Sequence, residues 1–240
     1  MRLAFISDIH GNIPALEAVL EDIKSMNVDQ IAVLGDLCLL GPETERVVER
    51  IRRLGVPTIK GNSEEWMIRG IEPGEVPDEI IGPFSQEREW VLERISQTNL
   101  DYLKTLKTEL TFEVGELTIQ AFHATPNSLF DVVAPNVDDH LMVEEQMMKS
   151  DADIYIYGHI HQPFSRYLSG KCLINCGAVG LPFDGNPQAS YALVEVGGEH
   201  VTTSIRRISY DVEAVVAICE EVGYPNAEMV SRIVRSGYNR

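Results

Sequence analysis

The first sixty residues alternate between short apolar runs and amphipathic segments, and this alternation constrains the fold more than any other feature of the chain. Buried strands are predicted at Leu3–Ser7, Asp29–Leu34 and Pro57–Lys60. A helix capped by Asn12 and a second helix over Glu43–Leu54 separate them. This β-α-β-α-β succession implies parallel strands with right-handed crossovers. Polar residues that follow the strands then gather at one edge of the sheet, where open α/β sheets bind ligands.

The remainder of the chain predicts a helical insertion, a second group of strands and a helical end. Residues 63–107 are broken by glycine and proline and carry helices at Ser85–Ile95 and Leu100–Leu106. We expect an insertion beside the ligand-binding edge, where substrate selectivity would reside. Further helices are predicted at Asp138–Lys149 and within residues 211–240, and we interpret residues 1–240 as one α/β domain. Strands are expected at Thr111–Val114, Leu117–Phe122, Ile154–Tyr157, Phe164–Leu168, Cys172–Asn175, Tyr191–Val196 and Val201–Ile208.

The formal charge of −17 restricts the expected partners. Nucleic-acid binding rests largely on lysine and arginine that neutralise phosphates, so a nucleic-acid polymer is not an expected partner. No apolar run approaches the roughly 20 residues that span a bilayer, so no membrane association is expected and a cytoplasmic location is predicted. The four cysteines lack Cys-x-x-Cys spacing, which agrees with a reducing compartment. The sequence does not decide whether the chain forms a homo-oligomer. If it does, the C-terminal helices are the expected interface.

Polar side chains follow each of the three N-terminal strands. Asp8 and His10 come after the first strand, Asp36 after the second and Asn62 after the third. Each segment alone suits a helix cap or a turn equally well. Together they bring two carboxylates, an imidazole and an amide oxygen to the same edge of the predicted sheet. This combination indicates a metal site.

Four of the six histidines of the chain also stand at strand ends. His123 directly follows one predicted strand, and His159 and His161 follow the glycine after another. A buried histidine is costly unless it is hydrogen-bonded or ligated. The strand ends therefore offer enough ligands for two adjacent metal ions, and only His140 and His200 have no such place.

In chain order these segments read D-x-H, G-D, G-N, H and G-H-x-H. The ordered combination resembles the calcineurin-like metallophosphoesterases over residues 3 to about 196, and the short loops are most similar to their compact bacterial and archaeal phosphodiesterase branch. The resemblance implies a four-layer α/β/β/α sandwich of two mixed sheets. It also implies hydrolysis of a small phosphodiester or nucleotide-type phosphate ester by a hydroxide that two metals about 3.5–4 Å apart activate.

The resemblance also implies a role for each polar residue at the strand ends. By the motif, the first metal is held by Asp8, His10 and His161, the second by Asn62, His123 and His159, and Asp36 bridges them. Mixed nitrogen and oxygen ligands suit Mn, Fe, Zn, Co or Ni, and the family favours Mn²⁺. Asp36, Asn62 and His123 would act in catalysis through the metals, and the general acid is unassigned.

Two positions depart from the family pattern. Many relatives carry a catalytic histidine after the motif asparagine, whereas here Ser63 stands at that position. Glu64, Glu65 or a water could protonate the leaving group instead, or the substrate carries a good leaving group. Ala124 replaces a frequent glycine and narrows the phosphate pocket slightly. The gap at Ser63 keeps two alternatives open, which are a catalytically weak metal-binding scaffold and a nucleotide sensor.

Overall fold

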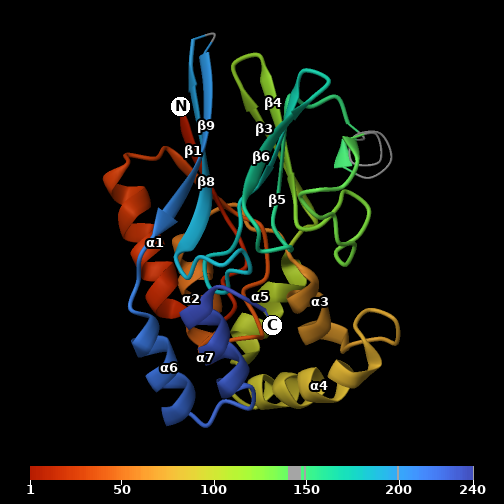
Figure 1. Cartoon of the computed structure of the whole chain (residues 1–240), viewed down its shortest axis with the longest axis vertical. Coiled ribbons are helices and arrows are strands. Elements are labelled where there is room, and N and C mark those ends of the chain that lie inside the picture. The colour runs from red at the N-terminus through yellow and green to blue at the C-terminus, as the bar shows by residue number, and fades with distance from the viewer. Residues whose placement is uncertain (140–146, 149, 199, 240) are drawn as a thin grey trace.

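Two β-sheets stand side by side in the upper half of the molecule, and most of the helices gather below them (Figure 1). The computed structural model describes residues 1–139, 147–148, 150–198 and 200–239. The first sheet contains β1 (Arg2–Ile6), β2 (Gln30–Val33), β8 (Ala189–Gly197) and β9 (His200–Ile208). The second contains β3 (Glu109–Val114), β4 (Leu117–Phe122), β5 (Ile154–Tyr157), β6 (Phe164–Leu168) and β7 (Lys171–Asn175).

Both sheets are mixed. In the first, of order β2-β1-β8-β9, β1 runs parallel to β2 and antiparallel to β8. In the second, of order β3-β4-β5-β7-β6, the three central strands are parallel and both edge strands are antiparallel to their neighbours. The prediction of an α/β sandwich of two mixed sheets is confirmed. The seven strands predicted beyond residue 107 are also present, each within two residues of its predicted ends.

The strand predicted at Pro57–Lys60 is wrong in its extent. Only Thr58 and Ile59 form isolated bridges, the first to Val33 and the second to Lys107. Pro57 has no N–H to donate, and the N–H of Lys60 donates to the carbonyl of Lys107 at 2.9 Å. The segment therefore pairs with the end of β2 at Val33 and with Lys107 before β3, so that it connects the two sheets.

Alternate residues of β1 face two different cores. Leu3 and Phe5 belong to the cluster between the two sheets, together with Ile119 of β4. Ala4 and Ile6 belong to the cluster that includes the apolar face of the helix after β1. Burial on both faces explains why the strand is continuously apolar. Each fully buried large side chain contributes roughly 1.5–3 kcal/mol to folding.

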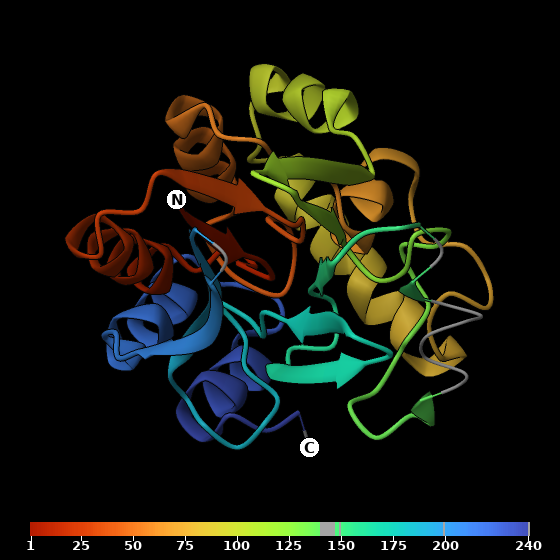
Figure 2. The same cartoon turned by 90° about the horizontal axis from the view of Figure 1, so that it is seen from above.

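The described helices are α1 (Ile13–Ser25), α2 (Thr44–Leu54), α3 (Asn62–Arg69), α4 (Asp78–Leu92), α5 (Gln97–Thr105), α6 (Val212–Glu221) and α7 (Ala227–Ser236). The Asn12 side chain accepts the N–H of Ala15 at 3.0 Å, which confirms the predicted cap of α1. Gly55 ends α2 with a φ of 68°, as a helix-terminating glycine does. In the view from above, α1 and α6 lie on one side of the molecule and α4 lies on the opposite side (Figure 2).

The insertion contains three helices, although the sequence pattern predicts two. The additional helix, α3, begins at Asn62 itself, so the third polar segment opens a helix and is not an extended turn. The next helix, α4, begins at Asp78 and continues through Pro83, where the pattern predicts a break. The helix predicted at Asp138–Lys149 lies largely outside the described residues. Among the described helices, none is both long and apolar enough to cross a membrane.

Candidate metal centre

Five of the seven predicted ligands have a left-handed backbone. The φ angles are 55° for Asp8, 47° for His10, 54° for Asp36, 66° for His159 and 55° for His161. Only a few per cent of residues other than glycine adopt such angles, and they gather at functional sites where the surrounding fold maintains the strain. This backbone turns each side chain sharply out of its strand end. The sequence signals that could have revealed it are the adjoining glycines of the G-D and G-H-x-H motifs.

The first cluster contains Asp8, His10, Asp36 and His161, whose candidate ligand atoms lie within 4.8 Å of one another. Nε2 of His161 lies 3.1 Å from Oδ1 of Asp8. Nε2 of His10 lies 3.5 Å from Oδ2 of Asp36. All four side chains are buried. The structure thus brings the three residues of the predicted first metal site together with the predicted bridging carboxylate.

The second cluster contains Asp36, His123 and His159. Nε2 of His123 lies 3.5 Å from Oδ1 of Asp36, so the two oxygens of this carboxylate face different clusters. The amide oxygen of Asn62 lies 2.9 Å from Nε2 of His123 and 2.9 Å from Nδ1 of His159. All seven predicted ligands therefore meet at one place. The exposed His200 lies apart at the start of β9, and His140 is outside the described residues.

The hydrogen bonds of the rings show why this place fits cations. Nδ1 of His10 donates to the carbonyl of Cys38 at 3.0 Å, and Nδ1 of His123 donates to that of Leu34 at 2.8 Å. Nδ1 of His161 likewise meets a backbone carbonyl. In each neutral ring the proton is then on Nδ1, so Nε2 presents a lone pair to the cluster. Lone pairs and carboxylate oxygens that face one another repel, and divalent cations remove that repulsion.

Burial and the carboxylates set the protonation of these groups. Burial lowers the pKa of His10, and it lowers the pKa of His159 to about 4. Burial alone would raise the pKa of Asp8, but His161 and the other imidazoles hold it well below its usual range. Burial opposes protonation of His123, yet Asp36 and Asp8 raise the pKa of that ring. In addition, Nε2 of His159 is buried without a hydrogen-bond partner among the described atoms. Asp8 therefore offers anionic oxygens, and His10 and His159 offer neutral nitrogens.

Glu64 organises the loop that carries Asp36. Its two oxygens accept the N–H groups of Asp36 and Leu37 at 2.8 Å each, of Cys38 at 3.1 Å and of Gly61 at 2.7 Å. The side chain is fully buried on the first turn of α3. Burial and the nearby Asp36 raise the pKa of Glu64, whereas these N–H donors oppose that shift. The sequence pattern alone does not indicate this role, because the donors come from distant segments.

Neither glutamate considered as a proton donor is free for that role. Glu64 is bonded as described above, and Glu65 pairs with Lys60 at 2.6 Å and with Arg69 at 3.2 Å. Ser63, which replaces the family histidine, is 1% exposed and donates its hydroxyl to Glu64 at 3.0 Å. Its N–H donates to Asp36 at 2.9 Å. This serine therefore supports the bridging carboxylate instead of presenting a proton to a substrate.

Two glycines allow the ligands to approach closely. A Cβ placed on Gly61 would lie 2.2 Å from Oδ1 of Asp36 and 2.7 Å from Cε1 of His123. A Cβ placed on Gly158 would lie 2.5 Å from Oδ2 of Asp8. The glycines of the G-N and G-H-x-H motifs are therefore required by the packing of the ligands themselves.

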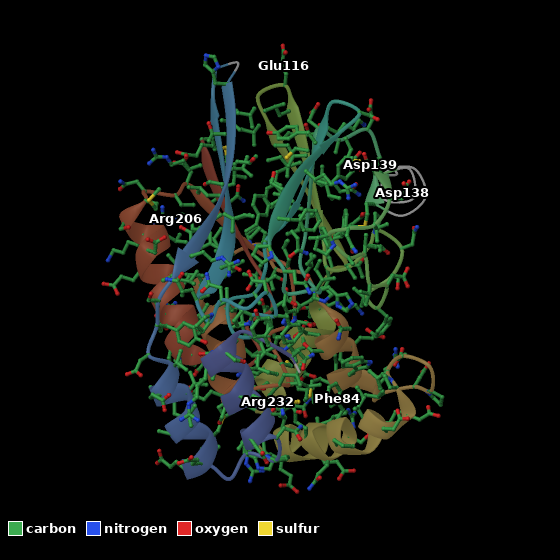
Figure 3. All side chains as sticks on the ribbon, viewed as in Figure 1. Phe84, Glu116, Asp138, Asp139, Arg206 and Arg232 are labelled. Atoms are coloured by element: carbon green, nitrogen blue, oxygen red, sulfur yellow. The ribbon has the colours of Figure 1, made fainter. Side chains whose placement is uncertain are left out.

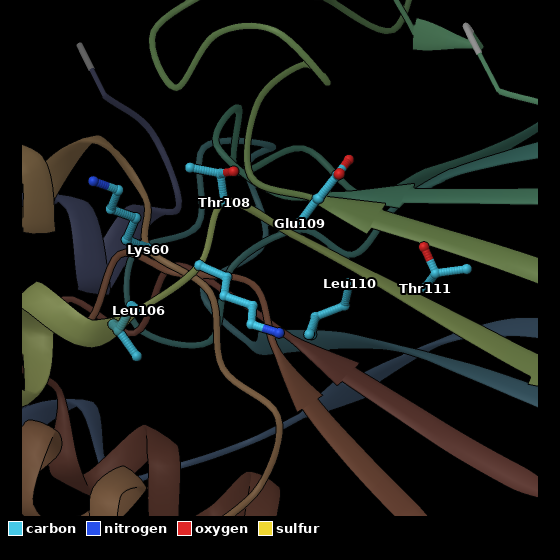
Figure 4. A pocket seen from close by; sticks show the side chains of 7 residues that line it. Lys60, Leu106, Thr108, Glu109, Leu110 and Thr111 are labelled. Carbon is cyan, nitrogen blue, oxygen red and sulfur yellow. The ribbon is translucent and has the colours of Figure 1, made fainter.

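An open hollow of about 680 Å³ lies beside the start of β3, and Figure 4 shows its lining. Lys60 and Lys107 contribute its positive charge, and Glu109 contributes negative charge. None of the seven ligand residues lines it. The ligand clusters therefore belong to a different place in the fold, between the ends of the two sheets.

These features define an α/β sandwich whose facing strand ends carry two clusters of nitrogen and oxygen donors that share one carboxylate, a donor set suited to divalent metal ions. The model of the calcineurin-like phosphoesterase superfamily domain matches residues 1–199. The chain belongs to this superfamily. The family relationship supports hydrolase activity on phosphate esters.

Similar proteins cover nearly the whole chain. An uncharacterised protein of Methanocaldococcus jannaschii is 28% identical in an alignment of 232 residues that covers 88% of this chain and 88% of that protein. Phosphodiesterase YfcE of Escherichia coli is 26% identical over 206 residues, covering 81% of this chain and 88% of that protein. The crystal structure of a metallophosphoesterase from Sphaerobacter thermophilus superposes with a TM-score of 0.79 at 27% identity over 99% of both chains. A hypothetical protein of Pyrococcus horikoshii gives a TM-score of 0.81 at 21% identity over 100% of this chain and 99% of its own, which shows the shared fold.

Proposed function

We propose that the protein is a metal-dependent phosphoesterase that hydrolyses a small phosphodiester or a nucleotide-type phosphate ester. The observation that carries this proposal is the position of Asp36, whose two oxygens face the two ligand clusters. Asp8, His10 and His161 would hold one ion, and the ligands of the second ion would be Asn62, His123 and His159. Mn²⁺ is favoured within the family, and the same donors suit Fe, Zn, Co or Ni.

A pair of divalent ions would supply the positive charge that activates a water and neutralises phosphate oxygens. The protein itself holds the ligand rings in place through their Nδ1 bonds to backbone carbonyls. It also places Asp36 through the contacts of Ser63 and Glu64. These fixed hydrogen bonds support a preorganised site, which needs little rearrangement when a phosphate binds.

The side chains around Asn62 also restrict the substrate. Ser63, Glu64 and Glu65 are all bonded within the protein, so none of them is available as a general acid. We therefore propose a preference for esters whose leaving group departs without protonation, such as aryl esters. The charge of −17 supports a small substrate and not a nucleic-acid polymer.

Metal analysis combined with a substrate panel tests this function. Protein reconstituted with Mn²⁺ is assayed against an aryl monoester, an aryl diester and a dinucleoside polyphosphate, and its metal content is measured. We expect two ions per chain and turnover of the aryl diester, both lost in Asp8→Ala and His159→Ala. The exposed His200→Ala serves as the matched control, since it lies outside the clusters.

The alternative is a metal-binding scaffold or nucleotide sensor on the same fold, which Ser63 favours because it replaces the histidine that many relatives carry. A protein that holds both ions but turns over no member of the panel would support this alternative. Nucleotide binding without turnover, measured by calorimetry, would then separate a sensor from a scaffold.

A further inference from the structure

Glu87, on α4, is a buried carboxylate outside the metal ligands, with 1% of its surface exposed. Its Oε1 accepts the N–H of Leu40 and the hydroxyl of Tyr224. Its Oε2 accepts the side-chain amide of Asn226 at 2.6 Å. Three separate parts of the chain therefore meet at this group, which are the insertion, the loop after β2 and the segment between α6 and α7.

The N–H that Leu40 donates belongs to a peptide unit that also contacts a predicted metal ligand. The carbonyl of the same peptide is that of Leu39, and it lies 3.2 Å from Nδ1 of His10, which it shares with the carbonyl of Cys38 at 3.0 Å. Leu39 and Leu40 have φ angles of 57° and 54°, which leucine rarely adopts. One strained peptide is thus held by Glu87 on its N–H side and meets His10 on its carbonyl side.

The corresponding contact at His161 is built differently. Its Nδ1 lies 2.5 Å from the carbonyl of Leu181, and the next residue is Pro182, which has no N–H. That peptide cannot be bonded from its other side. His161 is instead supported by the ring of Phe183, stacked at 4.2 Å. The two-sided peptide therefore distinguishes His10 from His161.

We propose that Glu87 is a positioning residue that orients His10 for metal binding through the Leu39–Leu40 peptide. An anionic acceptor on the N–H polarises the peptide and strengthens its carbonyl as an acceptor for Nδ1 of His10. Hydrogen bonds of this outer kind fix the tautomer and the orientation of a ligating imidazole, and losing them typically lowers metal affinity about 10–100-fold. The inference rests on the proposed metal site.

This arrangement gives the C-terminal segment a part in the metal site. Tyr224 and Asn226 lie beyond residues 1–199, the part that matches the superfamily model. Asn226 stands at the N-cap of α7 but makes no capping bond with its side chain, which bonds Glu87 instead. The segment thus supplies two of the three donors that hold the carboxylate in place.

The first test is Glu87→Gln in the full-length protein. The introduced amide keeps one oxygen that accepts hydrogen bonds from Leu40 and Tyr224. Its NH₂ group, however, faces the NH₂ group of Asn226, so two hydrogen-bond donors oppose each other and the bond to Asn226 is lost. We expect the affinity for one of two Mn²⁺ ions to fall about 10–100-fold in calorimetric titration of the metal-free protein, with the affinity for the other ion nearly unchanged. In the double variant Glu87→Gln with Asn226→Asp, the introduced NH₂ group again faces an acceptor, but Leu40 still donates to a neutral oxygen, and we expect this variant to recover part of the affinity.

The second test observes His10 directly and needs no metal. In metal-free protein labelled with ¹⁵N-histidine, the Nδ1–H signal of His10 is assigned by its loss in His10→Asn. We expect this signal to shift in Glu87→Gln and to move part of the way back in the double variant, while those of His123 and His161 stay in place. A signal of His10 that does not respond to Glu87→Gln would overturn the proposal.

Asp22→Asn is the matched control for general destabilisation. Asp22 accepts a hydrogen bond from the hydroxyl of Tyr191 at 2.7 Å. It also accepts hydrogen bonds from Nε and from one terminal nitrogen of Arg206, at 2.8 Å each. This group of residues lies on the outer side of the first sheet, where Figure 3 labels Arg206. We expect this variant to be less stable than the wild type. Its metal affinity and the position of the His10 Nδ1–H signal should stay the same as in the wild type. Equal metal loss in both variants would show that Glu87 acts only through stability. A wild-type protein that binds no metal would contradict the proposed function, and the His10 signal would still decide the role of Glu87.

Discussion

Nε2 of His10 lies 3.3 Å from Nε2 of His161. Both rings bond backbone carbonyls through Nδ1, so when both rings are neutral two Nε2 lone pairs face each other in a buried place. Their rings are also close, with centroids 5.0 Å apart. In that neutral form the two lone pairs repel each other, and a cation bound by both would convert the repulsion into attraction.

The first prediction concerns metal removal. A chelator should lower the melting temperature, and Mn²⁺ at about 100 times its dissociation constant should raise it by about 5–10 °C, since binding then contributes about 2.7 kcal/mol. Differential scanning fluorimetry measures the shift. It should persist in His200→Ala and be lost in Asp8→Ala. An equal melting temperature with chelator and with metal would contradict the assignment of the clusters.

The second prediction concerns Gly61→Ala. The added Cβ would lie 2.2 Å from Oδ1 of Asp36, so the carboxylate has to move. A misplacement of about 1 Å can lower a catalytic rate on the order of 10²-fold, and we expect a loss of that size in diesterase assays. Gly82→Ala is the matched control, because nothing lies within 4 Å of its Cβ, and in a helix it should add up to about 1 kcal/mol of stability. Full activity in Gly61→Ala would contradict the prediction, because it would show that catalysis does not require the observed position of the Asp36 carboxylate.

The third prediction concerns Glu64→Gln. This side chain accepts four backbone N–H groups, and one oxygen would be replaced by a donor. We expect a loss of about 2–3 kcal/mol in the free energy of unfolding, measured by urea denaturation. Activity should fall by the same factor for esters with good and with poor leaving groups. A selective loss for poor leaving groups would instead identify Glu64 as a general acid.

The fourth prediction concerns pH and Asp22. The hydrogen bond from Arg206 lowers the pKa of this carboxyl, with Tyr191 adding to the effect against burial. Its contribution is therefore fully present above the unfolded value of about 3.9 and is lost as the pH falls through the lower folded value. Asp22→Asn should cost about 1 kcal/mol in urea denaturation near pH 7, and the difference from wild type should shrink below about pH 4. A difference that grows on acidification would contradict the shift.

The strand ends that carry the site could be predicted from the sequence because two local signals coincide there. Buried runs such as Ile154–Tyr157 end at a glycine, and a polar pair such as His159 and His161 follows. Parallel strands bring such ends to one edge, so local pattern and topology point to the same residues. The rule places Asp8 and Asp36 at the edge of one sheet and His123, His159 and His161 at the edge of the other, but it does not predict that the two edges face each other.

What the sequence does not predict depends on contacts between distant segments. The start of α3 at Asn62 is stabilised by the side chain of Glu64, which accepts N–H groups from the loop after β2 as well as from Gly61. The role of Glu87 likewise depends on Leu40 and on the C-terminal Tyr224. A buried glutamate has no periodic signature, because its partners are distant in the sequence and near only in the folded chain.

The ligands come from both sheets, and this has a mechanical consequence. Asp8 and Asp36 follow strands of the first sheet, whereas His123 and His161 follow strands of the second. An ion bound between them acts as a cross-link, so separating the sheets at this rim requires breaking coordination bonds as well as exposing apolar surface. We expect the amides near these strand ends to exchange with solvent much more slowly in the metal-loaded protein, so that the proposed metal centre would also hold the two sheets together.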